Sequence, residues 1–168
     1  MRVTEHIGVE LMSSVREAGS QVMQVYEEDY SIDSKEDQSP VTTADLMSEQ
    51  VILETVRALD DSPIVSEESG VEGNPEQEYW LIDPLDGTKD FIQGTGEFAI
   101  MVGKIKKGSP IAGIVYAPAL GKLWYAEKGE GAYVEDEGGI RPLEVSCKKD
   151  LNEYELVVSR NHFREQDG

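Results

Sequence analysis

The chain has 168 residues, of which 39% are apolar, so one domain with a real core fits its length. Its 34 acidic and 15 basic side chains give a formal net charge of −19. This excess of carboxylates repels phosphate backbones and anionic membrane surfaces, which excludes nucleic acid and membrane as partners bound by charge.

The first third of the chain has the pattern of two amphipathic helices. Residues 4–28 are predicted to form the first helix, with Thr4 as its N-cap. Residues 30–40 are polar and end in proline, which predicts a loop. The second helix is expected from about Thr42 to Asp60.

Beyond the second helix the apolar pattern changes to short strands separated by turns. This succession predicts an antiparallel meander, and thus an α+β fold in which two N-terminal helices pack on a largely antiparallel sheet. An uncovered sheet face in such a fold favours a homo-oligomer. Strands are expected over residues 63–66, 79–83, 97–105, 110–118, 122–129, 132–134, 140–145 and 155–159.

Cys147 is the only cysteine, so an internal disulfide is excluded. This cysteine usage suits a reducing cytoplasm, where we expect the protein to be located. We interpret Cys147 as a small packing residue. No apolar run approaches the length needed to span a bilayer, and the N-terminus lacks an apolar signal core.

The most informative segment is WLIDPLDGTKDF, residues 80–91. An apolar strand leads to Asp83, where we expect the chain to turn, and Asp86 follows three residues later. The Leu85 carbonyl lies between them, so two carboxylates and one carbonyl, whose oxygens suit a hard cation such as Mg²⁺, are close together in the sequence. The alternative interpretation is a tight turn with a solvated pair of aspartates.

Gly87 and Thr88 follow these oxygens directly. Glycine permits close approach of another group, and backbone amides near a helix N-terminus point toward an anion. The segment therefore combines oxygens for a cation with amides for a phosphate.

Two further segments place acidic side chains at the ends of predicted elements. Glu67 and Glu68 end the strand in PIVSEESG, where solubility alone would explain them. Thr42 and Asp45 in SPVTTAD fit a helix capping box, which is sufficient to explain both.

The order and spacing of VTTAD, SEE and DPLDGTKDF resemble the inositol monophosphatase superfamily. Lys89 and Asp90, together with GEFAI, GIVYAPALGKLWYA and VVSRNH further along, are more similar to its 3'(2'),5'-bisphosphate nucleotidase branch. The resemblance covers nearly the whole chain and implies the N-terminal half of that family's layered sandwich.

The resemblance implies a site with two or more Mg²⁺ ions. Glu67, Asp83 and the Leu85 carbonyl would hold the first ion, and Asp83 would bridge to a second that Asp86 also binds. Gathered carboxylates raise one another's pKa, and divalent cations remove that cost.

The same resemblance implies the catalytic groups and the phosphate site. Thr88 and Asp45 would orient and deprotonate the attacking water, while the amides of Gly87 and Thr88 hold the phosphate. Glu68 would support the metal ligands from behind, and His162 would reach toward a nucleotide.

The function implied is that of a Mg²⁺-dependent, lithium-sensitive phosphomonoesterase of sulfur metabolism. Its small-molecule substrate would be 3'-phosphoadenosine 5'-phosphate or the sulfated relative, losing the 3'-phosphate. Inositol monophosphate or fructose 1,6-bisphosphate are alternative substrates. A truncated, weakly active or inactive metal-binding or interaction module is a second alternative, and an acidic α+β domain without a site is the third.

One motif of the family has no counterpart here. Family members carry a W-D-x-x-A-G type motif whose aspartate completes the second metal site, and nothing in the chain matches it. We therefore expect residues 1–168 to be the N-terminal metal- and phosphate-binding domain, with the family's C-terminal domain absent. A homo-oligomer would then cover the missing half.

Overall fold

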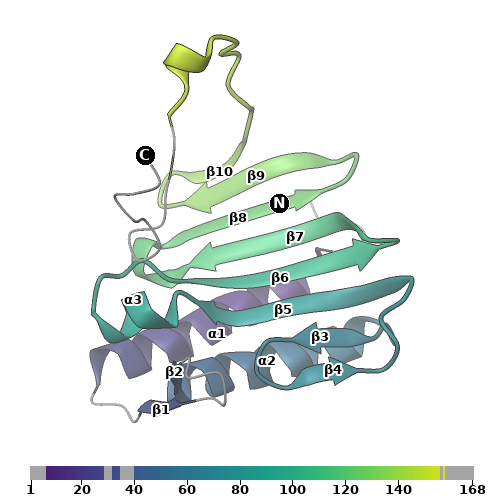
Figure 1. Cartoon of the computed structure of the whole chain (residues 1–168), viewed down its shortest axis with the longest axis vertical. Coiled ribbons are helices and arrows are strands. Elements are labelled where there is room, and N and C mark those ends of the chain that lie inside the picture. Colours follow the sequence, from purple (N-terminus) through teal and green to yellow (C-terminus); the bar gives the residue numbers. More distant parts are fainter. Residues whose placement is uncertain (1–6, 29–31, 35–39, 156, 158–168) are drawn as a thin grey trace.

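The computed structural model describes residues 7–28, 32–34, 40–155 and 157. An eight-stranded sheet carries two long helices, α1 and α2, on one face (Figure 1). A short helix, α3, follows the fifth strand along the chain. The predicted α+β fold with a largely antiparallel sheet is confirmed. The helices are α1 (Val9–Glu27), α2 (Thr43–Leu59) and α3 (Thr88–Ile92), with 3-10 turns η1 (Pro118–Leu120) and η2 (Leu151–Glu153).

The large sheet has the strand order β10-β9-β8-β7-β6-β5-β3-β4. Neighbours pair antiparallel except β3 and β5, which run parallel. Its strands are β3 (Ile64–Ser66), β4 (Gly70–Glu72), β5 (Glu78–Asp86), β6 (Ala99–Lys106), β7 (Ser109–Ala117), β8 (Lys122–Glu127), β9 (Gly131–Asp136) and β10 (Gly139–Pro142).

The sequence predicts an N-cap for each of the two long helices, α1 and α2, and one of the two predictions is confirmed. Helix α1 begins at Val9 with Gly8 as N-cap, so the prediction of Thr4 as the cap was wrong. Helix α2 begins after Thr42, whose side chain accepts from the Ala44 amide, while Asp45 accepts from the Thr42 amide. The predicted capping box is confirmed. It could be predicted because all of its partners are local in sequence.

Several strand predictions need correction. Two strands of three residues, β1 (Ile32–Ser34) and β2 (Pro40–Thr42), form an antiparallel ribbon where we expected only a loop. Strand β5 does not end at Asp83 but continues to Asp86, with an irregular register against β6 between these residues. Strand β4 was not predicted. Glu155 and Val157 are not in a strand, and the rest of the strand predicted over 155–159 lies outside the described residues.

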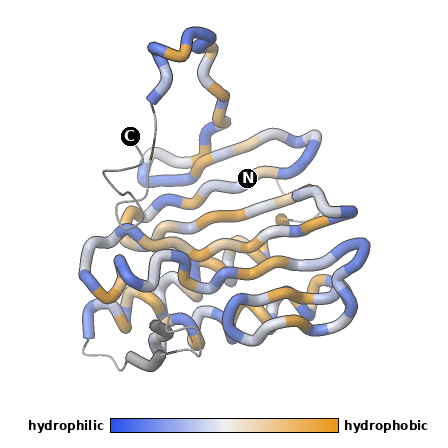
Figure 2. Tube along the Cα trace, viewed as in Figure 1, coloured by the Kyte–Doolittle hydropathy of each residue, from blue (hydrophilic) through white to orange (hydrophobic). Residues whose placement is uncertain are grey.

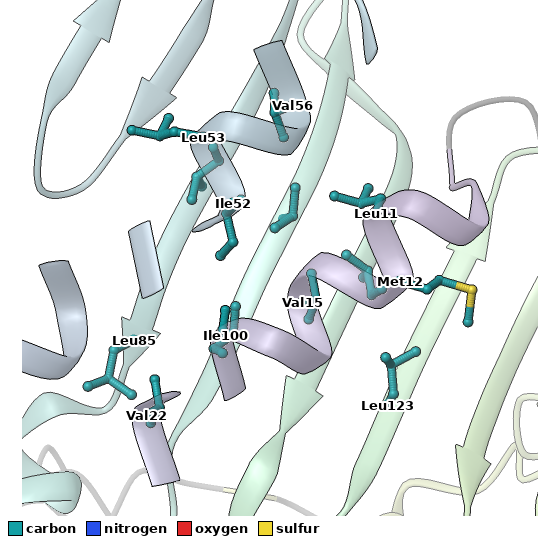
Figure 3. Packing of buried hydrophobic residues seen from close by; sticks show 14 of the residues in the cluster. Leu11, Met12, Val15, Val22, Ile52, Leu53, Val56, Leu85, Ile100 and Leu123 are labelled. Carbon is teal, nitrogen blue, oxygen red and sulfur yellow. The ribbon is translucent and has the colours of Figure 1, made fainter. Parts of the chain in front are cut away.

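The core lies between the two long helices and the sheet. Figure 2 shows hydrophobic stretches along the central strands and hydrophilic turns between them. Alternate residues of β6 to β8 point toward the helices and are buried, because side chains of a strand alternate between its faces. Figure 3 shows this packing for Leu11, Met12, Val15, Val22, Ile52, Leu53, Val56, Leu85, Ile100 and Leu123.

The other face of the sheet is less covered. Leu81 lies between two buried residues of β5, so it points away from the helices, and 44% of it is exposed. Met101, Val115 and Trp124 lie side by side on the same face, on β6, β7 and β8, and are half-buried. The sheet thus has one fully packed face and one partly open apolar face.

The position of Cys147 differs from the one expected from the sequence. Cys147 is exposed, so the expectation that it packs in the core was wrong. It lies in a stretch after β10 that has no regular secondary structure, where no sheet face covers it.

Within the described ranges, none of the helices combines the length and apolarity that crossing a bilayer requires.

A buried lysine follows two buried apolar residues on the inner face of β6. Lys104 is 1% exposed, and its Nζ lies 4.4 Å from the centre of the Trp80 ring. The Nζ donates to Asp60 Oδ2 at 2.8 Å and to Ser62 Oγ at 2.5 Å. Burial alone would raise the pKa of Asp60, but hydrogen bonds from Lys104 and Ser62 outweigh it and lower this pKa to about 2.

We expect Asp60→Asn to lower the free energy of unfolding by about 1–3 kcal/mol, because it leaves the Lys104 ammonium without its nearest anion. The value is below that of a fully buried pair because 41% of the Asp60 side chain is exposed to screening solvent. Urea unfolding of the variant, with the exposed Asp61→Asn as control, measures it.

The pH dependence of this loss follows from the lowered pKa. The stabilisation from Asp60 is complete above its ordinary pKa and is lost as the pH falls through the folded-state value of about 2. The difference between wild type and Asp60→Asn should therefore be larger at about pH 7 than at about pH 3. An equal difference at both pH values would contradict the assignment.

Candidate active site

The acidic segments meet because β3 and β5 are parallel neighbours. Ser66 lies opposite Ile82 at the end of this pairing, and the Glu67 amide donates to the Ile82 carbonyl at 3.1 Å. The carboxyl ends of parallel strands meet at the same sheet edge. Glu67 and Asp83 are thus placed side by side, and their carboxyl groups share a hydrogen bond.

The surroundings of Asp83 raise the pKa of its carboxyl. Partial burial of its carboxyl makes the largest contribution and raises the pKa. The charge and hydrogen bond of Glu67 and the charge of Asp86 raise it further. The Leu85 amide, which donates to Asp83 Oδ1 at 3.2 Å, opposes this only in part. The pKa of Asp83 therefore rises to about 7, so without a cation this carboxyl retains its proton below neutral pH.

The irregular end of β5 turns its backbone oxygens toward neighbouring elements. The Leu85 side chain is 1% exposed and lies in the core (Figure 3), while its carbonyl accepts from Thr88 Oγ1 at 3.2 Å. The Pro84 carbonyl accepts from Ser48 Oγ of α2 at 2.7 Å. The bulge between Asp83 and Asp86 is therefore held from both sides.

Asp45 and Thr88 bring the starts of α2 and α3 together. Asp45 is 1% exposed, and its Oδ2 accepts from the Thr42 amide at 2.8 Å and the Thr42 hydroxyl at 2.6 Å. Its Oδ1 lies 3.4 Å from Thr88 Oγ1. Asp45 thus caps its own helix with Oδ2, while its Oδ1 faces the Thr88 hydroxyl.

Gly87 links Asp86 to α3 in a conformation that a side chain would oppose. Its φ is 86°, in the left-handed region, and a Cβ built there would lie 2.8 Å from the Glu97 carbonyl oxygen. The first helical bond of α3 runs from the Phe91 amide to the Gly87 carbonyl. The amides of Gly87 and Thr88 precede this bond, so the ladder of the helix does not use them.

The donor set suits a hard cation. It consists of carboxyl and carbonyl oxygens, which Mg²⁺ prefers. Within the described residues, however, no three or more Asp, Glu, His or Cys side chains are gathered tightly enough to hold a metal ion. The structure therefore brings Glu67 into contact with Asp83, and Asp86 into electrostatic range, without a closed cage.

The remaining predicted residues have different outcomes. Glu68 is half-buried in the turn after β3, and its supporting role stays a prediction. His162 lies outside the described residues. Sequence reasoning missed Ser48 and Glu49, which contact the site segments from α2. Their signal was their spacing, three and four residues after Asp45, which places all three on one helix face.

Comparisons with known proteins agree with this geometry. The Inositol monophosphatase family matches residues 4–167. The 3'(2'),5'-bisphosphate nucleotidase CysQ of Salmonella typhimurium is 41% identical over 153 residues, which are 88% of this chain and 61% of that protein. The chain thus spans less than two thirds of this curated relative.

Solved structures share the fold. The extragenic suppressor protein SuhB from Bartonella henselae matches with a TM-score of 0.73 and 29% identity, over 83% of this chain and 54% of that one. CysQ from Bacteroides thetaiotaomicron, a bacterial member of the inositol monophosphatase family, matches with a TM-score of 0.65 and 26% identity, over 84% and 58%. With its acidic strand ends in contact and the family match extending over nearly its full length, the chain belongs to the inositol monophosphatase family.

Proposed function

We propose that the chain is the N-terminal metal- and phosphate-binding domain of a Mg²⁺-dependent phosphomonoesterase, a 3'(2'),5'-bisphosphate nucleotidase. The observation that carries the proposal is the contact of Glu67 with Asp83, beside Asp86, at one sheet edge. The nucleotidase activity is supported by the name of the Salmonella relative and by its 41% identity.

The metal ligands would come from two strand ends. Glu67, Asp83 and the Leu85 carbonyl would hold one Mg²⁺, and Asp83 and Asp86 would hold another. Bound divalent cations neutralise phosphate charge and make water a better nucleophile. Their binding would also offset the burial and the charges of Glu67 and Asp86, which raise the pKa of Asp83.

Thr88 and Asp45 would handle the proton of the attacking water. The Thr88 hydroxyl would accept a hydrogen bond from the water and donate its own proton toward Asp45 Oδ1, 3.4 Å away. The water oxygen would then bond to phosphorus as the bond from phosphorus to the ester oxygen breaks. One proton of the water would end on Asp45, and the leaving oxygen would take a proton from solvent. Burial of Asp45 keeps competing water from its carboxylate.

The phosphate would be held by the turn that follows Asp86. The amides of Gly87 and Thr88 lie at the beginning of α3, ahead of its first helical bond. Because the surrounding carboxylates repel a dianion, phosphate would bind only with the cations present.

The test is phosphate release by the chain from four substrates, each with Mg²⁺ and with EDTA. These are 3'-phosphoadenosine 5'-phosphate, its sulfated relative, inositol 1-phosphate and fructose 1,6-bisphosphate. We expect Mg²⁺-dependent, lithium-sensitive release that is fastest from the two nucleotides. Faster release from the inositol or fructose ester would replace the nucleotidase assignment, and Mg²⁺ binding without any turnover would favour a binding module.

A further inference from the structure

One face of α2 contacts all the chain segments that form the candidate site. Asp45, Ser48 and Glu49 are spaced so that they lie on the same side of the helix. Asp45 reaches Thr88, Ser48 reaches the Pro84 carbonyl, and Glu49 reaches the turn after β3. The helix is thus a common support for segments that are far apart in the sequence.

Glu49 makes the most specific of these contacts. Its side chain is buried, with 7% exposed, and Oε1 accepts from Ser66 Oγ at 2.5 Å and from the Ser69 amide at 2.9 Å. These donors flank Glu67 and Glu68 in the chain. A single carboxylate oxygen therefore ties both ends of the turn that carries Glu67.

The energetics favour a positioning role over simple attachment of the helix. Burying a carboxylate is costly unless it is hydrogen-bonded, and apolar residues could join helix and sheet without that cost. Charge-assisted bonds to both ends of a turn also restrict the backbone between them. Since the Glu67 amide is bonded to the Ile82 carbonyl of β5 at the same time, the backbone from which the Glu67 carboxylate extends is fixed beside Asp83.

We propose that Glu49 is a positioning residue that holds the carboxylate of Glu67 in place for the divalent cation. This inference rests on the proposed function, in which Glu67 is a metal ligand. Glu49 itself contacts neither metal nor substrate and acts through the Ser66–Ser69 turn.

The experiment measures Mg²⁺ affinity by isothermal titration calorimetry on the full chain and three variants. Glu49→Met removes the acceptor, and Glu49→Gln keeps an oxygen in its place. Glu54→Gln is the matched control, since Glu54 lies exposed on the same helix. We expect Glu49→Met to bind Mg²⁺ about 10- to 100-fold more weakly, as loss of a residue supporting a metal ligand does. Glu49→Gln should recover most of the affinity, and Glu54→Gln should match wild type.

Hydrogen exchange at the Ser69 amide gives a readout that needs no metal. It should be faster in metal-free Glu49→Met than in wild type or Glu54→Gln. Should Glu49→Met not fold, Ser66→Ala removes one of the same hydrogen bonds from the end of β3 and should weaken Mg²⁺ binding in the same direction.

Glu67→Gln separates failure of this inference from failure of the proposed function. If Glu67→Gln weakens Mg²⁺ binding while folded Glu49→Met or Ser66→Ala does not, the positioning role is overturned and the metal site stands. If Glu67→Gln leaves Mg²⁺ binding unchanged, the proposed function and the inference fall together. Weaker binding in Glu67→Gln, Glu49→Met and Ser66→Ala, with most of the affinity recovered in Glu49→Gln, supports the inference.

Discussion

Replacing Asp83 with asparagine should lower Mg²⁺-dependent phosphate release about 10³-fold or more, because metal-ion stabilisation of the transition state amounts to several kcal/mol. The same change should raise the thermal stability of the metal-free chain. Asparagine removes a charge that Glu67 and Asp86 repel, and it retains an oxygen for the Leu85 amide. Activity and stability should therefore move in opposite directions.

The stability effect has a definite pH dependence. The pKa of Asp83 is about 7 in the folded chain, above its ordinary value of 3.8, so the folded chain retains a proton that the unfolded chain releases. This contribution to stability is complete below the ordinary value and is lost as the pH rises through about 7. Asparagine does not titrate, so the advantage of Asp83→Asn should be greatest above about pH 8.

Thermal unfolding in EDTA at several pH values measures this effect, and phosphate release with Mg²⁺ measures the activity. The exposed Asp61→Asn serves as control and should change neither quantity. An Asp83→Asn chain that is less stable than wild type at high pH would show that Asp83 is not crowded by carboxylates.

Asp45→Asn and Thr88→Val should each lower kcat by about 10²- to 10⁴-fold, the usual contribution of a positioned proton acceptor. Neither residue is a proposed metal ligand, so Mg²⁺ affinity should stay within about threefold of wild type if the ligand shell is intact. Thr88→Ser retains the hydroxyl and should keep most of the activity. Initial rates at saturating Mg²⁺, together with Mg²⁺ titrations, separate the two effects.

The double variant tests whether these two residues act as one unit. If Thr88 passes its proton to Asp45, the second substitution should add little to the loss caused by the first. Asn at position 45 keeps an acceptor for the Thr42 amide, so the cap of α2 survives and unfolding should change by only about 1 kcal/mol. Fully additive losses in kcat would contradict the shared proton path.

The parts of this site that depend on local chemistry could be predicted from the sequence. The Thr42–Asp45 capping box and the glycine after Asp86 follow from helix-start and turn preferences alone. The contact between Glu67 and Asp83 could not be derived in this way. It depends on β3 pairing parallel with β5 in a register that places Ser66 opposite Ile82, which no local pattern specifies.

Glu49 shows the same limit more clearly. A glutamate in the middle of a helix is usually a solvated surface residue, and its spacing from Asp45 indicates a shared helix face but not burial. Its role arises only when α2 packs against the turn after β3. The β1–β2 ribbon was missed for a related reason, since three-residue strands are too short to show a period.

In the proposed site, Glu67, Asp83 and Asp86 would bind Mg²⁺ together. Calorimetric titration of Mg²⁺ into the chain, in two buffers of different ionisation heat, tests this arrangement. A proton must leave Asp83 when the cation binds, so we predict release of about one proton per chain near pH 6 and almost none near pH 8.5. Binding and proton release should both disappear in Asp83→Asn. Mg²⁺ binding that releases no proton near pH 6, or that persists unchanged in Asp83→Asn, would show that Asp83 is not a ligand of the cation.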